Sequence, residues 1–263
     1  MPPPAPPILP PEVRALEDAK IRSYRDRIEG IARADGDPGR AAVKTFGGMA
    51  AFRGPDRSFV YGLTDADLPH LEAMFDWFAG VKPYVQTVAH DAATGAAEAL
   101  LARGYRPHGY MAVLAGPAGP RSPDAPPGVA VRALDAPEET FVDTYVRGYA
   151  WDAVTAEARH RLDVAAQYAG APWRLCVAEV DGRAACIGAL HLQGRVGFLA
   201  NAATVADARN RGAHGAVLNW RIDRAAREGC DIVASDTAAF SGSHRNMARA
   251  GLALAYQRVR WKP

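Results

Sequence analysis

The residues best suited to chemistry lie in one segment, ATVADARNRGAHGAVLNWRIDRAAREGCD, which runs from Ala203 to Asp231. A strand-like apolar run ends at Val205, and a turn that carries glycines, Arg209 and Arg211 leads into a helical pattern. Small residues let a ligand approach the backbone closely, and the first amides of a helix are unpaired donors at the positive end of its dipole. The segment therefore predicts an anion site, and the two arginines favour phosphate groups.

Four residues outside this turn are candidates for proton transfer. We favour Asp236, at the end of an expected buried strand, and Tyr256, on the last expected strand, as the catalytic residues. Glu179 and His191 lie on two strands of an expected hairpin. Each candidate also has an open structural interpretation: a carboxylate that caps a loop or faces solvent, a hydrogen-bonded core histidine, or a packed aromatic ring.

The three cysteines, Cys176, Cys186 and Cys230, are far apart and surrounded by apolar residues. A metal-binding or catalytic cysteine needs a second ligand at short spacing or a basic partner. The apolar surroundings instead favour buried thiols, and the sequence predicts no metal site.

Alternating strands and helices must position the turn. A hairpin is indicated by the pair Asp181-Gly182, and the long helix after the turn ends at Gly229, a residue typical of helix C-termini. The periods of apolar residues predict strands over residues 129–134, 173–180, 185–192, 196–205, 231–236 and 254–261, and helical segments over 139–149, 215–228 and 245–251.

The first half of the chain is expected to contain strands and helices in an order similar to that of the second half. Its last helix ends near Gly104 as the late helix of the second half ends near Gly251, and a strand with a tyrosine follows each. This indicates a weak internal repeat, with chance as the open alternative, because helices commonly end at glycine. The expected elements are strands over 58–64, 83–89 and 108–115 and helices over 66–80 and 93–105, with Leu71, Phe75 and Phe78 in a core.

Two proline-rich segments divide the chain. Residues 1–11 form an expected disordered leader, because proline has no amide donor for a helix or a ladder. A second proline-rich segment is an expected linker over residues 116–127. The sequence thus predicts two domains, over residues 12–115 and 128–263.

Composition narrows the class of protein. A hydrophobic fraction of 49% and a charged fraction of 23% are typical of globular domains. The 31 basic and 29 acidic residues are interspersed, without the basic stripe that binds nucleic acid. No apolar run approaches the roughly 18 residues that span a bilayer, and no signal peptide is indicated. We expect a cytoplasmic protein that binds neither nucleic acid nor membranes.

The turn resembles the coenzyme A signature of the GNAT N-acyltransferase superfamily: Arg or Gln, two residues, Gly, one residue, then Gly or Ala. Arg209, Gly212 and His214 fall on these positions, so the last one departs from the pattern and is tolerated if its side chain points outward. The resemblance covers about half of the chain, from about Gly128 to Pro263, and includes the strand order and the late helix. A plain solvated turn between strand and helix is the alternative.

The resemblance implies an α/β (α+β) fold of tandem GNAT-like domains, with a mixed central sheet flanked by helices and a complete C-terminal copy. The first half looks like a degenerate copy, because GLTDADLPHLEAMFDW carries acids and a proline where phosphates need amides and arginines. The family's strand carboxylate falls on Phe198 and its late-helix tyrosine on Met247, so both of its usual proton-transfer residues are missing.

The resemblance further implies transfer of an acetyl or other short acyl group from acetyl-CoA, or another acyl-CoA, to a primary amine of a small molecule or peptide. Tyr149, Trp151 and Asp152 are candidates for the acceptor pocket, but neither the acceptor nor the oligomeric state can be read from the sequence. Two other functions stay open: an acyl-CoA-binding sensor without turnover, and a structural partner protein. The expected coenzyme-binding residues are Ala202, Ala203, Thr204, Arg209, Asn210, Arg211, Gly212, Ala213, His214, Gly215 and Asn246.

Overall fold

The computed structural model describes residues 11–37, 39–88, 94–121, 125–149, 158–170 and 172–263. The predicted leader, apart from Pro11, and the pocket candidates Trp151 and Asp152 lie outside these ranges. Within them, none of the helices has the length and apolar character needed to cross a membrane.

The chain forms two compact units. They differ from the predicted domains where unit 2 begins and at the C-terminal end of the chain. Unit 1 comprises residues 1–113, 236–241 and 254–263, and unit 2 comprises residues 114–235 and 242–253. The last strand therefore belongs to unit 1, because β11 (Ala253–Lys262) pairs antiparallel with β4 (Tyr84–Val88). Strand β5 (Arg106–Pro117) runs into the predicted linker and contributes residues to both units.

Unit 1 is a mixed sheet with the strand order β1-β2-β3-β4-β11. Strands β3 and β4 are parallel, and the other pairs described here are antiparallel. The sequence did not predict α1 or the hairpin of β1 and β2, since charged residues break up the apolar period over this region. The further elements of unit 1 are α1 (Pro11–Asp35), β1 (Ala42–Phe46), β2 (Met49–Arg53), β3 (Phe59–Tyr61), η1 (Asp65–His70), α2 (Leu71–Trp77) and α3 (Thr94–Ala102).

Two layers of apolar side chains cover the sheet of unit 1. Helices α2 and α3 bury one face, and the predicted core residues Leu71 and Phe78 are confirmed there, with Phe75 packed against them. Helix α1 lies on the other face, where the ring of Tyr24 meets Phe52 edge-on with centroids 5.0 Å apart. Both faces of this sheet are therefore occupied by helices.

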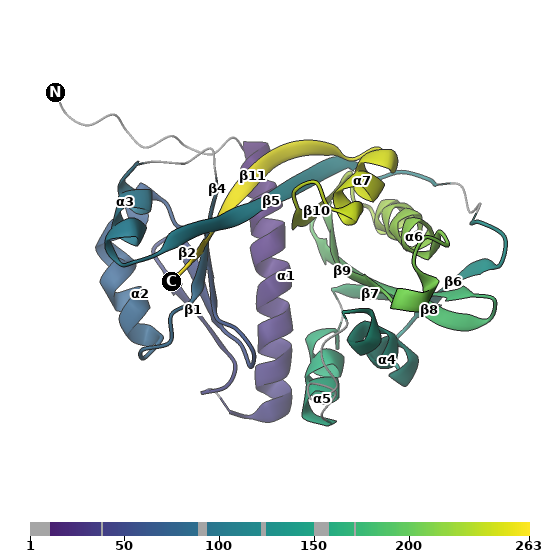
Figure 1. Cartoon of the computed structure of the whole chain (residues 1–263), viewed down its shortest axis with the longest axis horizontal. Coiled ribbons are helices and arrows are strands. Elements are labelled where there is room, and N and C mark those ends of the chain that lie inside the picture. Colours follow the sequence, from purple (N-terminus) through teal and green to yellow (C-terminus); the bar gives the residue numbers. More distant parts are fainter. Residues whose placement is uncertain (1–10, 38, 89–93, 122–124, 150–157, 171) are drawn as a thin grey trace. The chain divides into compact units, whose positions relative to one another are not determined.

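Unit 2 contains the predicted strand succession, and its sheet has the order β10-β9-β8-β7-β6. Helix α6 covers one face while α4 and α5 cover the other (Figure 1). The hairpin of β7 and β8 turns at Asp181-Gly182 as predicted, with φ angles of 51° and 76°. Its elements are β6 (Val129–Leu134), α4 (Glu139–Gly148), α5 (Ala158–Gln167), β7 (Trp173–Val180), β8 (Arg183–Gln193), β9 (Val196–Thr204), η4 (Ala206–Ala208), α6 (Ala213–Arg227), β10 (Ile232–Ala238) and α7 (Gly242–Arg249).

The predicted repeat is present in the backbone of the two units. In each, a parallel pair of strands is joined through a helix, as β3 to β4 and β9 to β10. A second helix then ends at a glycine with positive φ, 86° at Gly104 and 85° at Gly251. The two chain reversals also share their hydrogen bonds, from Gly104 to Leu101, Tyr105 to Leu100, Gly251 to Ala248 and Leu252 to Met247.

A buried group of charges in unit 1 joins α1 to β11 and the end of β10. The guanidinium of Arg258 is fully buried, with Nε 2.6 Å from Glu17 Oε1 and Nη1 2.8 Å from Asp236 Oδ2. Lys20 Nζ lies 3.1 Å from the same carboxylate of Asp236. Tyr256 donates its hydroxyl proton to Glu17. We call these five residues the unit 1 charge cluster.

Removing Arg258 leaves two carboxylates of this cluster without their buried partner. We expect Arg258→Met to lower the free energy of unfolding by about 3 to 5 kcal/mol, measured by denaturant titration. The control is Arg132→Met, because Arg132 and Glu138 form an ion pair with both side chains nearly half exposed. That change costs less than about 1 kcal/mol. Equal losses for the two variants would show that the cluster is open to water.

Candidate functional site

The turn between β9 and α6 has the backbone that its composition predicts. Asn210 and Gly212 both adopt positive φ, 63° and 87°, so the chain reverses twice before α6 begins at Ala213, two residues earlier than predicted. A Cβ on Gly212 would lie only 2.4 Å from Pro126 Cγ. Glycine is thus required at 212 both by its φ and by the close packing of Pro126.

The first turn of α6 presents backbone donors. The first helical hydrogen bond runs from Ala216 N to Gly212 O at 3.0 Å, so the amides of Ala213, His214 and Gly215 precede the helical ladder. No atom comes within 4 Å of a Cβ built on Gly215, so the space on that side of the residue is open. Bare amides at the positive end of a helix suit a phosphate or diphosphate.

Three arginines surround a hollow of about 430 Å³ beside this turn: Arg147 at the end of α4, Arg183 at the start of β8, and Arg211. Arg211 is half exposed and lies 2.5 Å from Asp181. Asp207 is the acid in the lining. The basic side chains outnumber the acid in the lining, so the hollow adds positive charge beside the turn that leads into α6.

Strand β9 is paired with β10 over its first residues only. The parallel register runs from Val196 to Phe198, whereas β9 continues to Thr204. The register with β8 shifts between Leu199 and Ala202, so β9 carries one extra residue there, a β-bulge. Residues 200–202 are half-buried and lie beyond the residues of β9 that pair with β10.

Arg221 of α6 holds this bulge from one face of the sheet, a contact that the sequence did not reveal. Its buried guanidinium donates Nη1 to the carbonyl oxygens of Ala189 and Ala200, at 3.4 and 3.3 Å. Burial lowers the pKa of Arg221, and among the described residues no carboxylate pairs with it. An arginine in the apolar stripe of a helix was the available sequence signal.

Asn201 holds the bulge from the other face. Its side-chain amide donates to the hydroxyl oxygen of Tyr149 at 2.8 Å and to that of Tyr145 at 3.5 Å. The two tyrosine rings of α4 lie against each other with centroids 4.7 Å apart. Tyr145 is buried and Tyr149 is half-buried. A polar residue within the apolar run of β9 was the signal that could have identified Asn201.

His214, which departs from the coenzyme A signature, has its side chain turned toward α7. Its Nδ1 accepts a hydrogen bond of 3.1 Å from the amide of Asn246 on α7. Arg249 in turn donates to Asn246 Oδ1 at 2.9 Å. The structure therefore brings together two predicted coenzyme-binding residues, with both side chains turned toward one another. Met247, on the same helix as Asn246, is buried.

The two favoured catalytic residues belong to the unit 1 charge cluster, whereas the coenzyme-binding candidates belong to unit 2. Burial opposes charge on Asp236, yet Lys20 and Arg258 outweigh it and hold the pKa of Asp236 below its usual value. Burial and Glu17 raise the pKa of Tyr256 well above its usual value. Both side chains therefore keep their ordinary charge states at neutral pH.

The other proton-transfer candidates have structural surroundings. His191 is fully buried, with its ring 4.8 Å from the ring of Trp173. Glu179 is half-buried at an irregularity of the β7–β8 pairing. The three cysteines are buried thiols, as predicted, and burial raises the pKa of Cys176 to about 12. In the described ranges, no group of three or more His, Cys, Asp or Glu residues could hold a metal ion.

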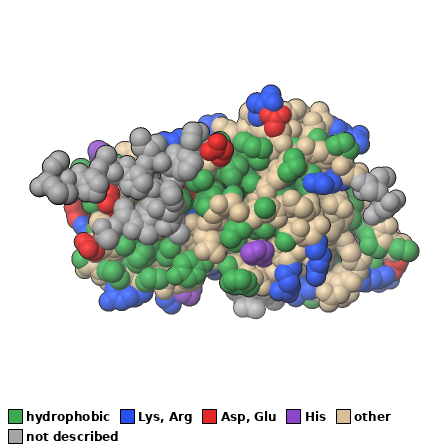
Figure 2. All heavy atoms as spheres, turned by 90° about the horizontal axis from the view of Figure 1, so that it is seen from above, with side chains coloured by type: hydrophobic (Ala, Val, Ile, Leu, Met, Phe, Trp, Pro, Cys, Tyr) green, Lys and Arg blue, Asp and Glu red, His purple; other side chains and the backbone are tan. Residues whose placement is uncertain are grey.

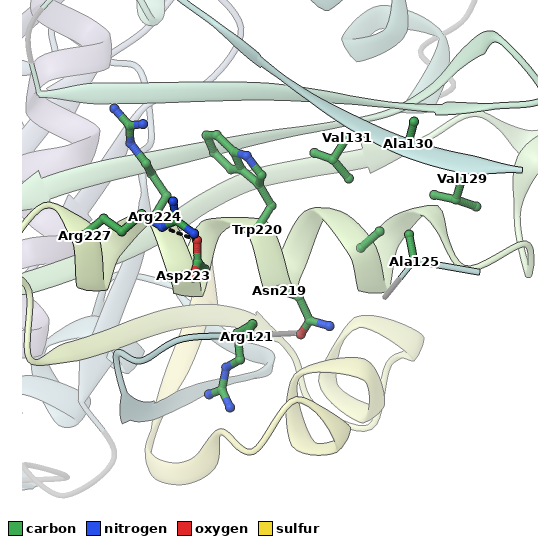
Figure 3. Close-up of a pocket in the computed structure, with 11 residues that line it drawn as sticks. Arg121, Ala125, Val129, Ala130, Val131, Asn219, Trp220, Asp223, Arg224 and Arg227 are labelled. Atoms are coloured by element: carbon green, nitrogen blue, oxygen red, sulfur yellow. Dashed lines mark ion pairs between the residues drawn. The ribbon is translucent and has the colours of Figure 1, made fainter. Parts of the chain in front are cut away.

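A second hollow, of about 350 Å³, lies where α6 meets β6. Trp220 and Val131 both line it, and Arg227 pairs with Asp223 at 2.7 Å (Figure 3). Elsewhere on the surface, lysines and arginines lie in several separate places on the face shown in Figure 2. The basic residues are thus dispersed there, as the interspersed charges of the sequence indicate.

The half-buried position of His214 and its neighbours predict its titration. Burial and the charge of Arg221 lower the pKa of His214 from 6.5 to about 4, so the ring is neutral at pH 7. Between these two values the unfolded chain binds a proton that the folded chain excludes, so stability falls as the pH is lowered through this window. NMR titration should give a midpoint near 4, and His214→Ala should lack this pH dependence. A midpoint near 6.5 would place the ring in solvent.

Comparison with known proteins identifies the fold. No protein-family model and no curated protein matches the chain. A GCN5-related N-acetyltransferase from Kribbella flavida superposes with a TM-score of 0.63 at 17% identity, over 92% of this chain and 94% of that one. A similar protein from Sphaerobacter thermophilus gives 0.57 at 19% identity, over 96% and 93%. A tandem GNAT protein from the clavulanic acid biosynthesis pathway gives 0.62 at 13% identity, over 94% and 95%. The chain has the tandem fold of GNAT N-acetyltransferases, as the sequence predicted.

Proposed function

We propose that unit 2 transfers an acyl group from acyl-coenzyme A to an amine. The observation that carries this proposal is the continuity of an anion site with an open strand edge. The unpaired amides at the start of α6 follow β9 after η4 and the turn, and the backbone of β9 from residue 199 onward extends past its pairing with β10. A ligand with phosphates at one end and amides along its length suits this arrangement.

Each part of the coenzyme has candidate residues in unit 2. The diphosphate suits the amides of residues 213–215 together with Arg209 and Arg211, and the positive φ of Asn210 and Gly212 turns the backbone to expose those amides. The amides of the pantetheine arm suit the backbone of residues 202–204. Asn246 does not need to contact the coenzyme itself: its hydrogen bond to His214 holds the first turn of α6 in position.

The reaction itself makes two demands on the protein. The amine nitrogen attacks the thioester carbon, so negative charge on the carbonyl oxygen must be stabilised, and the sulfur that leaves as a thiolate needs a proton. We do not assign these steps to Asp236 and Tyr256, because both are engaged in the unit 1 charge cluster. The bulge of β9, fixed by Arg221 and Asn201, is the candidate position for the thioester carbonyl.

A second candidate function, binding of acyl-CoA without turnover, is favoured by the engagement of Asp236 and Tyr256 in ion pairs and hydrogen bonds. Release of coenzyme A thiol in the presence of a panel of primary amines separates the two functions. Thiol release above the rate in buffer would exclude the binding-only function. The acceptor is an amine whose further structure this site does not specify.

Thermal unfolding with and without acetyl-CoA tests the coenzyme site. At a hundred times the dissociation constant the ligand adds about 2.7 kcal/mol to stability, which raises Tm by roughly 5 to 10 °C. Arg209→Ala should reduce this shift. The control Arg195→Ala removes an exposed arginine at the opposite end of β9, which pairs with Asp231, and should leave the shift unchanged. Absence of any shift in the parent protein would remove the proposed function.

A further inference from the structure

The proposed function leaves the hollow of about 430 Å³ beside the turn without a ligand of its own. Its walls come from the end of α4, from the β7–β8 hairpin and from the turn that follows β9, all of them in unit 2. The lining is apolar at Val180, Ala185, Val205 and Ala208, and its polar side chains are charged. An apolar hollow with a few charged groups is typical of a ligand site.

The charge around this hollow is mainly positive. It is lined by the three arginines Arg147, Arg183 and Arg211, and the acid in the lining is Asp207. The positive charge exceeds the negative charge, so a doubly charged anion suits the hollow better than a singly charged one. A phosphate monoester carries about 1.5 to 2 negative charges near pH 7, together with three acceptor oxygens.

The arginines are available to such an anion. Arg211 lies 2.5 Å from Asp181 and Arg147 lies 3.4 Å from Asp143, and these four side chains are about half exposed. Exposed ion pairs are weak because water screens them, so a phosphate can compete with these carboxylates. Arg183 is exposed and forms no ion pair with the residues that the structure describes.

Local structure fixes the backbone that carries the three arginines. Arg183 directly follows the turn at Asp181-Gly182, where both residues have positive φ. Arg147 lies in the last turn of α4. The ion pair of Arg211 with Asp181 connects the turn before α6 to the hairpin, so two walls of the hollow are held together. A hollow that is formed before the ligand arrives lowers the entropy cost of binding.

The hollow lies at the phosphate end of the proposed coenzyme site. Val205, Asp207 and Arg211 belong to the turn that leads into α6, whose first amides suit the diphosphate. Asn201, in the bulge proposed for the thioester carbonyl, is four residues before Val205, or about 13 Å along an extended strand. A small acceptor that reacts at the bulge therefore does not extend into the hollow. The 3′-phosphate of coenzyme A, in contrast, is separated from the diphosphate by only the ribose ring.

We propose that this hollow is a phosphate site, in which Arg147, Arg183 and Arg211 bind a phosphate monoester. Two sources share this chemistry. One is the 3′-phosphate on the ribose of coenzyme A, and this source rests on the proposed function. The other is a separate phosphate ion or ester, which does not. With the first source, the hollow selects coenzyme A over its 3′-dephosphorylated form.

Calorimetric titration of the full chain with coenzyme A, 3′-dephospho-coenzyme A and inorganic phosphate tests this inference. The buffer has low ionic strength and contains neither phosphate nor sulfate, because salt screens exposed charges. If the hollow binds the 3′-phosphate, coenzyme A should bind about tenfold more tightly than its dephospho form, which lacks these charge-assisted hydrogen bonds. If the phosphate is a separate molecule, the two coenzymes should bind alike, and inorganic phosphate should bind to protein saturated with coenzyme A.

The variants Arg147→Gln and Arg183→Gln each remove one positive charge from the hollow and leave Arg209 and the amides of α6 in place. Each should reduce the preference for coenzyme A, or the affinity for inorganic phosphate, by about threefold. The affinity for 3′-dephospho-coenzyme A should not change. The matched control is Arg195→Gln, which removes an exposed arginine that pairs with Asp231 at the other end of β9 and should alter neither quantity.

The outcomes distinguish this inference from the proposed function. If neither coenzyme binds, the proposed function fails, and the titration with inorganic phosphate decides the inference alone. Absence of phosphate binding together with equal affinity for the two coenzymes would overturn it. A phosphate affinity or coenzyme preference that is the same in Arg147→Gln, Arg183→Gln and Arg195→Gln, all folded as judged by thermal unfolding, would also overturn it, because the phosphate would then be bound outside the hollow.

Discussion

Parallel strands β9 and β10 stop pairing after Phe198 and Ala234, and the candidate site depends on this separation. Each residue beyond it still carries an amide and a carbonyl that need partners. Pairing with β8 supplies some of these, and Arg221 and Ser235 bind the carbonyls of Ala200 and Leu199. The remaining groups stay available to a ligand. In unit 1 the corresponding strand β3 is only three residues long and all three pair with β4. The same topology therefore leaves an open strand edge in unit 2 and none at this position in unit 1.

The two buried arginines show how the fold treats charge differently in its two halves. The charge of Arg258 on β11 is neutralised by Glu17 on α1 and by Asp236 on β10. These ion pairs hold α1 in place against β11. Arg221 instead binds backbone carbonyls. Carbonyl dipoles solvate a guanidinium without cancelling its charge, so a positive potential persists beneath the bulge. This is the expected difference between a cluster that holds elements together and a cation beside a site where negative charge develops.

Local sequence patterns predicted most of the strands, helices and turns of unit 2. The features that the sequence did not predict depend on contacts between residues far apart in the chain. The hairpin at Asp181-Gly182 and the turn before α6 follow from short-range preferences for positive φ and for a helix start, so both were predictable. The bulge of β9 depends on register with β8, which no local pattern specifies. The position of Asp236 at a strand end resembled a catalytic one, but its partner Lys20 lies 216 residues away in sequence. Helix α1 was not predicted for a related reason. Its few apolar residues are too sparse to indicate a helix by themselves, and they are buried only by contact with the sheet that the helix covers.

His214 illustrates how a departure from a signature can be accommodated. A glycine or alanine at this position would leave the start of α6 without a side chain directed at α7. The histidine ring reaches the amide nitrogen of Asn246, and its neutral state matches the hydrogen bond, because Nδ1 must accept from a nitrogen that can only donate. Asn246 is in turn oriented by Arg249. His214 and Asn246 were both predicted to bind the coenzyme. In the structure their hydrogen bond connects the first turn of α6 to α7 and so fixes the position of the first amides of α6.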